Sequence, residues 1–221
     1  MNLRWHVAQF FEIRWWQRYL GKRDPAAYLD WKRQYWRDFL AQSGLLVPPG
    51  ARVLDAGCGP AGIFTVLEEQ EVDAVDPLLH RYEKNLPHFR PVEHPNVHFI
   101  NALLEKFFPD RQYDFIFCLN ALNHVASLQQ SLGRLAALTA PGGTLAVSVD
   151  AHNHTLFKRL FRTMPGDILH PHQLDLEEYR ALLAAPGWMV QPPVLLKKGF
   201  FFNYYLLLAQ KVHPGDPATA G

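Results

Sequence analysis

Three glycines and two aspartates in the first half of the chain have the spacing of a nucleoside-binding unit. Gly57, Gly59 and Gly62 come shortly after Asp55, and the lack of Cβ atoms lets the chain turn sharply there and lets a ligand approach its backbone. Asp76 lies 19 positions after Gly57, at the end of a second apolar segment. A carboxylate at a strand tip can accept hydrogen bonds from both hydroxyls of a ribose. The alternative for the glycines is a tight turn without a ligand, and the alternative for Asp76 is an exposed surface acid. The combined spacing favours nucleoside binding.

Histidines are the other residues that could take part in chemistry. His124 follows a later apolar segment, and a neutral imidazole there could accept a proton from a hydroxyl or thiol group. A histidine that only bonds to the backbone or shapes a pocket is the alternative. Two His-x-His pairs occur within residues 150–175 and would be compatible with a metal site. We favour a pocket wall in which one histidine acts as a base or an orienting group, and we expect no metal; the four residues are His152, His154, His170 and His172.

The composition limits the class of protein. The chain has 221 residues and a formal net charge of +1, so it can form one large domain and has no overall attraction for nucleic acid. No apolar run is long enough to cross a bilayer, and the N-terminus lacks a signal-peptide pattern. Cys58 and Cys118 have neither disulfide nor metal-ligand spacing. We therefore expect a reduced, cytoplasmic protein.

Residues 1–45 are predicted to form an aromatic-rich helical cap. Asp24-Pro25 has the pattern of a helix start, and Ser43-Gly44 has that of a helix end. Between them, Lys32 is expected opposite an aromatic face that consists of Tyr28, Trp31, Tyr35, Trp36, Phe39 and Leu40. We predict that these helices pack on the rest of the chain. A second prediction, compatible with the first, is that they form a lid that lines a substrate pocket. A helix at a membrane interface, with its arginines at the head groups, is the alternative.

From residue 46 to residue 213, strand-like and helical segments alternate, and residues 214–221 are predicted to be a disordered tail. This alternation predicts an α/β fold with a doubly wound, mostly parallel sheet and ligands above the carboxyl ends of its strands. Strands are expected around Val53-Leu54 and within 72–77, 96–104, 113–119, 144–149, 188–196 and 200–209, and helices within 61–67, 127–138 and 174–183.

The ordered set of segments resembles the class I S-adenosylmethionine-dependent methyltransferases of the small-molecule type. The resemblance rests on residues 53–62, Asp76, residues 101–103, residues 113–125 and residues 141–145. It implies a Rossmann-like, seven-stranded sheet that is mostly parallel with an antiparallel last strand. It also implies S-adenosyl-L-methionine as the cofactor.

Carried over residue by residue, the resemblance implies a cofactor site in four parts and a substrate site beside it. The expected contacts of the amino-acid end are Asp55, Gly57, Cys58 and Gly59, those of the ribose are Asp76 and Pro77, those of the adenine are Ala102 and Leu103, and those of the methionine part are Leu119 and Asn120. The catalytic candidates are His124, His170 and His172, and the expected substrate contacts are Trp15, Tyr19, Asn123 and His152.

Other functions fit the sequence less well. A nicotinamide-binding domain also uses the spacing of Gly57, Gly59 and Gly62, but Asp55 directly before the turn and the fourth and fifth strand segments favour the methyltransferases. Residues 120–124 lack the signature of methyltransferases that act on amino groups of nucleic acids, so no nucleic-acid partner is expected. We predict methyl transfer to a small molecule, at an oxygen. A catalytically silent cofactor-binding scaffold or partner subunit is the alternative.

Overall fold

Eight strands form one mixed sheet in the computed structural model, which describes residues 3–152, 175–184, 187–199 and 202–213. The order is β3-β2-β1-β4-β5-β8-β6, with β7 also paired to β8. Strands β1 to β5 pair in parallel, and β8 is antiparallel to β5, β6 and β7. The strands are β1 (Arg52–Ala56), β2 (Glu71–Val75), β3 (Val97–Ile100), β4 (Tyr113–Leu119), β5 (Thr139–His152), β6 (Trp188–Val190), β7 (Val194–Lys197) and β8 (Phe202–Lys211).

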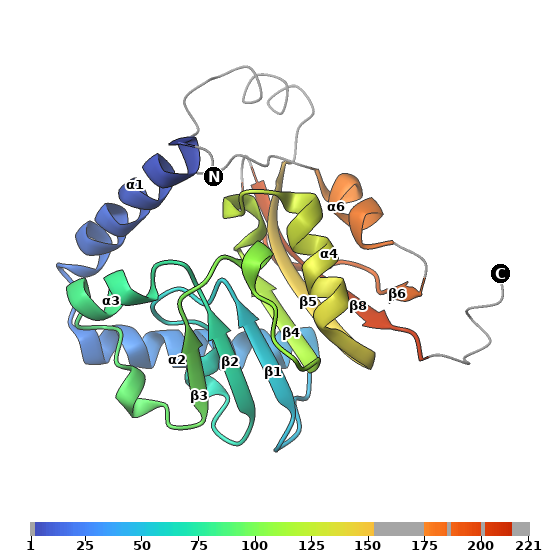
Figure 1. Cartoon of the computed structure of the whole chain (residues 1–221), viewed down its shortest axis with the longest axis horizontal. Coiled ribbons are helices and arrows are strands. Elements are labelled where there is room, and N and C mark those ends of the chain that lie inside the picture. Colours follow the sequence, from blue (N-terminus) through green and yellow to red (C-terminus); the bar gives the residue numbers. More distant parts are fainter. Residues whose placement is uncertain (1–2, 153–174, 185–186, 200–201, 214–221) are drawn as a thin grey trace.

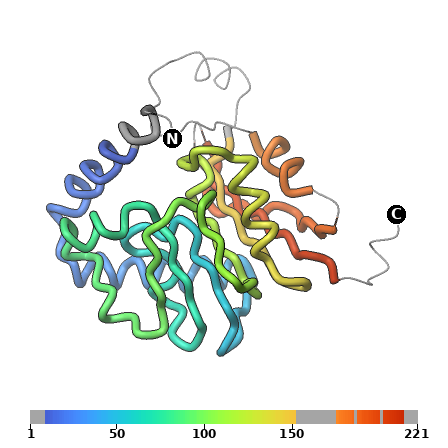
Figure 2. Tube along the Cα trace, in the orientation of Figure 1, coloured from blue at the N-terminus to red at the C-terminus, as the bar shows by residue number. Residues whose placement is uncertain are grey.

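The strand order reverses between β1 and β4, because the chain first builds outward through β2 and β3 and then returns to add β4 and β5 on the other side of β1. Figure 2 shows the first strands, blue to green, on one side of the sheet and the later strands, yellow to red, on the other. This reversal is the position at which doubly wound sheets bind ligands. The predicted fold class is therefore confirmed.

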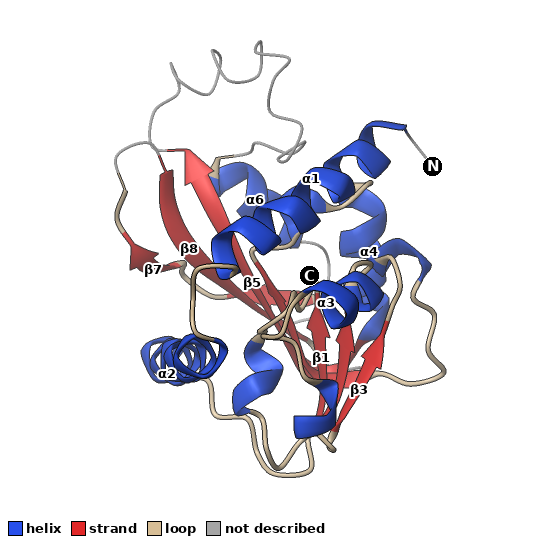
Figure 3. Ribbon diagram, turned by 90° about the vertical axis from the view of Figure 1, so that its left-hand side faces the viewer, coloured by secondary structure: helices blue, strands red, loops and turns tan. Residues whose placement is uncertain are grey.

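Helices cover both faces of the sheet, as Figure 1 shows. The α-helices are α1 (Leu3–Leu20), α2 (Pro25–Ser43), α3 (Leu79–Asn85), α4 (Leu128–Leu138) and α6 (Leu176–Leu183). Short 3₁₀ helices join them: η1 (Ile63–Val66), η2 (Pro91–Glu93), η3 (Leu104–Lys106) and η4 (Leu122–His124). In the turned view of Figure 3, α2 lies against one face of the sheet and α1 lies above the carboxyl ends of its strands.

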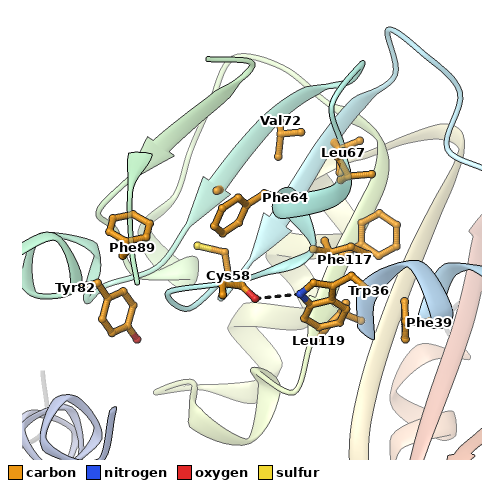
Figure 4. Packing of buried hydrophobic residues seen from close by; sticks show 14 of the residues in the cluster. Trp36, Phe39, Cys58, Phe64, Leu67, Val72, Tyr82, Phe89, Phe117 and Leu119 are labelled. Carbon is orange, nitrogen blue, oxygen red and sulfur yellow. Dashed lines mark hydrogen bonds between the residues drawn. The ribbon is translucent and has the colours of Figure 1, made fainter. Parts of the chain in front are cut away.

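The central strands β1 and β4 contribute to two hydrophobic cores because successive side chains point to opposite faces. Val53 and Phe117 belong to the core under α1, α2 and α3, whereas Leu54 and Ile116 belong to the core under α4 and α6. All four side chains are fully buried. Trp36 and Phe39 of α2 complete the first core, which Figure 4 shows at close range. Helix α2 is therefore part of the domain core.

Two details differ from the sequence prediction. The expected sixth strand is divided into β6 and β7, because Pro192-Pro193 between them lacks backbone N–H donors for a continuous ladder. The helix expected at 61–67 is only the 3₁₀ turn η1. Its Thr65 hydroxyl donates to the Gly62 carbonyl, a local bond that competes with helix propagation.

Capping residues set the ends of α2, as predicted. Asp24 is the N-cap, and its Oδ1 accepts a hydrogen bond of 2.9 Å from the backbone N–H of Ala27. Gly44 ends the helix in the left-handed region at φ 67°. Residues adjacent in the chain thus determine where α2 begins and where it ends.

We expect Asp24→Ala to lower the free energy of unfolding by about 1 kcal/mol, because the first turn of α2 loses its side-chain acceptor. Asp30→Ala is the matched control on the same helix, since the Asp30–Arg33 pair is an exposed ion pair worth about 0.5 kcal/mol or less. Urea unfolding of both variants measures the difference. Equal losses would contradict the assignment of Asp24 as a stabilising cap.

Candidate active site

A cavity of about 510 Å³ opens at the carboxyl ends of the strands, at the reversal between β1 and β4. Its floor comes from the glycine turn after β1, the tip of β2 and the loops after β3 and β4. Its walls come from α1, α2 and β8. Segments distant in the sequence therefore meet at one site of the size that small ligands occupy.

The glycine turn closes back onto the strand tips. Gly57 and Gly59 have φ values of 75° and 60°, which favour glycine. The N–H groups of Gly57 and Cys58 donate to the Val75 carbonyl at 2.7 and 3.2 Å. These two N–H groups are therefore bonded to the tip of β2, and η1 is a single 3₁₀ turn.

Asp55 braces the turn from below. Its Oδ2 accepts the backbone N–H of Phe64 at 3.1 Å, and the side chain is buried. Burial raises the pKa of Asp55 to about 7, an effect that the Phe64 N–H and the positive charge of Lys32 oppose. Asp55 is absent from the residues that line the cavity, so it stabilises the glycine turn from beneath the cavity floor.

Asp76 lies at the tip of β2 and lines the cavity. Its Oδ2 accepts the Gly59 N–H at 3.0 Å, and its Oδ1 accepts the Leu78 N–H at 2.8 Å. Burial raises its pKa to about 6, while these two N–H donors act in the opposite direction. Each carboxylate oxygen retains a second acceptor position, so Asp76 can accept hydrogen bonds from a pair of neighbouring hydroxyls.

Asn120 follows β4 in a left-handed conformation, with φ 54°. Its backbone N–H donates to the carbonyl oxygen and to the Oγ of Ser148, at 3.1 and 2.9 Å. The Ser148 hydroxyl also lies 2.6 Å from the Tyr204 hydroxyl, and Tyr35 of α2 is within hydrogen-bonding reach of Tyr204. Asn120, Tyr35 and Tyr204 all line the cavity. A polar chain thus connects β4, β5, β8 and α2 along one wall.

Lys32 is the cationic residue of the cavity within the described part of the chain. Its Nζ lies 4.2 Å from the centre of the Trp36 ring and 4.9 Å from that of Tyr35. Burial lowers its pKa to about 8, and the negative charge of Asp55 opposes this effect. The prediction that Lys32 faces away from the aromatic side chains is wrong, because positions 28, 32, 35 and 36 share one face at 3.6 residues per turn.

Helix α1 adds polar and aromatic groups above Asp76. Gln9, Glu12, Trp15 and Trp16 line the cavity. Trp15 stacks on Tyr19 with ring centroids 4.9 Å apart, and Tyr19 itself is not part of the lining. Phe10 and Phe11 are 46% and 47% exposed, so α1 has an apolar outer side as well as a cavity side. The alternative that this N-terminal helix lies at a membrane interface stays a prediction.

The structure brings most predicted site residues together. Those that line the cavity are Trp15, Gly57, Cys58, Gly59, Asp76, Pro77, Ala102, Leu103, Leu119, Asn120 and His124. Asp55, Tyr19 and Asn123 are not among the lining residues. His152 ends β5, and its backbone pairs with Phe202. His154, His170 and His172 lie outside the described residues.

Trp16, Tyr35 and Trp36 line the cavity as the prediction of an aromatic lid implies. Sequence reasoning missed several other lining residues, namely Gln9, Glu12, Lys32, Glu105, Val125 and Tyr204. Lys32 could have been found from helical periodicity alone. Tyr204 could not, because its place depends on the antiparallel pairing of β8 with β5, where it faces Asp150. Glu12 sits among aromatic residues that gave no clear stripe, so the sequence pattern did not show which side of α1 faces the cavity.

The described residues contain neither a membrane-spanning helix nor a metal-binding cluster. Within the described ranges, no helix combines the length and the apolar character that a membrane crossing requires. The same residues contain no cluster of three or more histidine, cysteine or acidic side chains arranged to hold a metal ion. The chemistry that these residues support is binding of a polar ligand by Asp76 and exclusion of water by an aromatic cap.

Comparison with known proteins agrees with this geometry. Residues 28–191 match a family model described as "Methyltransferase domain". A ubiquinone biosynthesis O-methyltransferase of Rickettsia bellii is 30% identical over 187 residues, which cover 72% of this chain and 75% of that protein. A trans-aconitate 2-methyltransferase of Methylobacterium nodulans is 34% identical over 184 residues, or 76% of this chain and 69% of that protein.

A solved structure shares the fold. It is the Burkholderia thailandensis 1,6-didemethyltoxoflavin-N1-methyltransferase with bound 1,6-didemethyltoxoflavin and S-adenosylhomocysteine. The TM-score is 0.64 at 19% identity, with 96% of this chain and 92% of that chain covered.

We expect Gly57→Ala to destabilise the fold by about 2 kcal/mol or more, because an alanine disfavours positive φ and its Cβ would collide with the Ala121 side chain. Gly133→Ala is the matched control. Gly133 lies in α4 with open space at its Cβ position, so this change should stabilise the protein by about 0.5–1 kcal/mol. Thermal unfolding of both variants tests the pair, and a neutral Gly57→Ala would show that the turn has more room than described.

Proposed function

The chain belongs to the class I S-adenosylmethionine-dependent methyltransferases, and from this premise we propose that it methylates a small-molecule acceptor at an oxygen. The observation that carries the proposal is the cavity, in which Asp76 and the glycine turn lie on the floor and aromatic side chains form the walls. The cofactor of the family is S-adenosyl-L-methionine.

The residues present fit this cofactor. Asp76 has free acceptor positions for the ribose hydroxyls, and a Cβ placed on Gly59 would meet no atom closer than Trp16 at 3.9 Å, so the turn is open on that side. We assign Ala102 and Leu103 to the adenine, and Leu119 and Asn120 to the methionine part. We assign Lys32 to the methionine carboxylate, because it is the lysine or arginine that lines the cavity among the described residues.

When bound, the cofactor supplies an electrophilic methyl group on a sulfonium. The protein then has to align an acceptor atom with that methyl and exclude water, which requires few catalytic side chains. We propose that Trp15 and Trp16 exclude water from above. Tyr35 and Tyr204 hold a polar wall beside Asn120 through their hydroxyl groups. His124 is our candidate for the base that removes the acceptor proton.

Two relatives support an oxygen acceptor. One is named an O-methyltransferase, and the other is named for transfer to trans-aconitate, an organic acid. A wall of aromatic side chains suits a flat, unsaturated or aromatic acceptor. We place the protein in the cytoplasm, without a nucleic-acid partner. Residues 1–45 serve as the cap in this proposal, and the remaining substrate contacts, including His152, His170 and His172, come from the 150–175 segment.

A catalytically silent cofactor-binding protein is the second candidate. It would bind S-adenosylmethionine through the same floor but would act as a scaffold or a partner subunit. The presence of His124, Tyr35 and Tyr204 at the cavity favours the enzyme, because a pure binding protein has no need for polar groups there.

A product screen separates the two candidates. The purified chain is incubated with S-adenosylmethionine and a panel of hydroxybenzoates, catechols and unsaturated di- and tricarboxylic acids that includes trans-aconitate, and S-adenosylhomocysteine release is measured. We expect release with at least one oxygen acceptor. Calorimetric binding of the cofactor without release for any oxygen, nitrogen, sulfur or carbon acceptor would favour the silent protein.

We expect Asp76→Asn to weaken S-adenosylhomocysteine binding by about tenfold or more. The neutral amide has one acceptor oxygen fewer than the carboxylate, and it lacks the negative charge that strengthens hydrogen bonds from the two ribose hydroxyls. Asp38→Asn, on the exposed side of α2, is the control and should keep the wild-type affinity. Titration calorimetry measures both. An unchanged affinity of Asp76→Asn would remove this residue from the ribose site.

We expect His124→Ala to lower kcat by about 100-fold or more with the acceptor identified in the screen, while cofactor affinity stays close to that of the wild type. The reason is that a base acts on the acceptor proton and contributes little to cofactor binding. His80→Ala, at an exposed position, controls for loss of an imidazole elsewhere. Full turnover of His124→Ala would leave this histidine with a role in pocket shape only.

A further inference from the structure

Helix α1 presents an unpaired buried acceptor to the cavity. Gln9 is only 6% exposed and lines the cavity. Its Nε2 donates to Glu12 Oε2 at 3.2 Å, whereas its Oε1 is buried without a hydrogen-bond partner among the described residues. A buried acceptor without a donor is unfavourable, and such an atom inside a ligand cavity indicates that the ligand brings the donor.

Glu12 lies one turn further along α1 and faces the same space. Its carboxyl group is within hydrogen-bonding reach of the Trp16 side chain. Burial and the negative charge of Asp76 together raise the pKa of Glu12 to about 8. Fully buried Tyr82 of α3 lies beside both carboxyl groups. Glu12 is therefore above the strand tip that carries Asp76, at the ribose end of the cavity.

The three side chains have the same requirement, which is a hydrogen-bond donor from the ligand. Asp76 below and Gln9 and Glu12 above all offer oxygen acceptors, so the molecule between them must supply several donors. Within S-adenosylmethionine, the ribose carries two adjacent hydroxyl groups. The ammonium group of the methionine part is the other strong donor, but our assignment places the methionine part at Leu119 and Asn120, at the end of the cavity that contacts Lys32.

We propose that α1 completes the ribose site, with Gln9 and Glu12 accepting hydrogen bonds from the hydroxyls that Asp76 holds from the opposite side. This inference rests on the proposed cofactor site, because it needs the ribose above Asp76. It assigns α1 a direct part in cofactor binding in addition to covering the acceptor. The helix then closes over a ligand only when that ligand has an intact ribose diol.

Among the described side chains, a small set of other contacts holds α1 in place. Ile13 and Leu20 are its buried apolar residues in the described core, and Gln17 bonds to Asn85 of α3 at 3.2 Å. The Trp16 and Tyr82 rings meet at 6.4 Å. Contacts to a ligand through Gln9 and Glu12 would add substantially to this small set. Ligand binding should therefore protect the backbone amides of residues 3–20 from hydrogen exchange.

The first experiment measures S-adenosylhomocysteine binding to the full chain by calorimetry. Gln9→Ala and Glu12→Ala should each weaken binding by about tenfold, because each removes an acceptor from a buried hydroxyl. Glu12→Gln keeps the size of the side chain and one acceptor oxygen, so it should lose less affinity than Glu12→Ala. It replaces Glu12→Ala in the comparison if that variant fails to fold. Arg18→Ala is the matched control on α1, at an exposed position, and should bind as the wild type does.

The second experiment tests the diol directly with adenosine and 3′-deoxyadenosine as probes. The wild type should prefer adenosine strongly, and Glu12→Ala should show a reduced preference, which a purely structural role would not produce. Hydrogen exchange should show protection of residues 3–20 by S-adenosylhomocysteine in the wild type and much less in Glu12→Ala.

The outcomes separate the two proposals. Wild-type affinities in Gln9→Ala and Glu12→Ala, or an unchanged preference for adenosine, would overturn the role of α1 while leaving the cofactor site intact. Failure of the wild type to bind S-adenosylhomocysteine at all would overturn the proposed site on the strand tips, and the role of α1 with it.

Discussion

The hydrogen bond from the Gly59 N–H to the Asp76 carboxylate is the interaction on which the site depends. It ties the turn after β1 to the tip of β2, at 3.0 Å, and so fixes the floor of the cavity. The N–H groups of the glycine turn find partners at the end of β2, namely the Val75 carbonyl and Asp76. Asp76 therefore orients the turn and also presents acceptor positions to a ligand. The two backbone N–H donors explain why burial of this carboxylate is tolerated, and in the proposed site the ribose hydroxyls would fill its remaining acceptor positions.

Burial controls the charges around the cavity. The pKa of Asp55 rises to about 7, that of Asp76 to about 6 and that of Glu12 to about 8, while that of Lys32 falls to about 8. In each case desolvation is the largest cause, because a low-dielectric site disfavours the charged form of any group. The carboxyl oxygens that line the cavity still act as hydrogen-bond acceptors, so the site favours a ligand that brings hydrogen-bond donors. S-adenosylmethionine brings such donors through its ribose hydroxyls and its ammonium group.

The sequence predicted the elements with local signals and missed contacts that depend on the assembled sheet. Asp24 and Gly44 mark the ends of α2, and Ser127 caps α4, because capping uses residues adjacent in the chain. The glycine motif and Asp76 were found because their spacing follows from a strand, a turn and a second strand. The helix expected after the turn was wrong, since the apolar residues of 61–67 fill the core against α2 through a 3₁₀ turn instead. Tyr204 and Glu12 reach the cavity only through long-range packing, which periodicity does not encode.

The two N-terminal helices differ in how firmly they belong to the fold, and this difference bears on specificity. Helix α2 buries Tyr28, Leu29, Trp36 and Phe39, and the Trp36 indole N–H donates to the Ala61 carbonyl at 3.0 Å (Figure 4). It is held by the same core as the strands, so Lys32 and Tyr35 are presented from a fixed frame. Helix α1 leaves Phe10, Phe11 and Trp15 about half exposed, and its buried apolar side chains among the described residues are Ile13 and Leu20. Groups on α2 can therefore define the position of the cofactor and acceptor, whereas groups on α1 can respond to whether a ligand is present. A methyltransferase needs both properties, because the acceptor must enter an open site and react in one from which water is excluded.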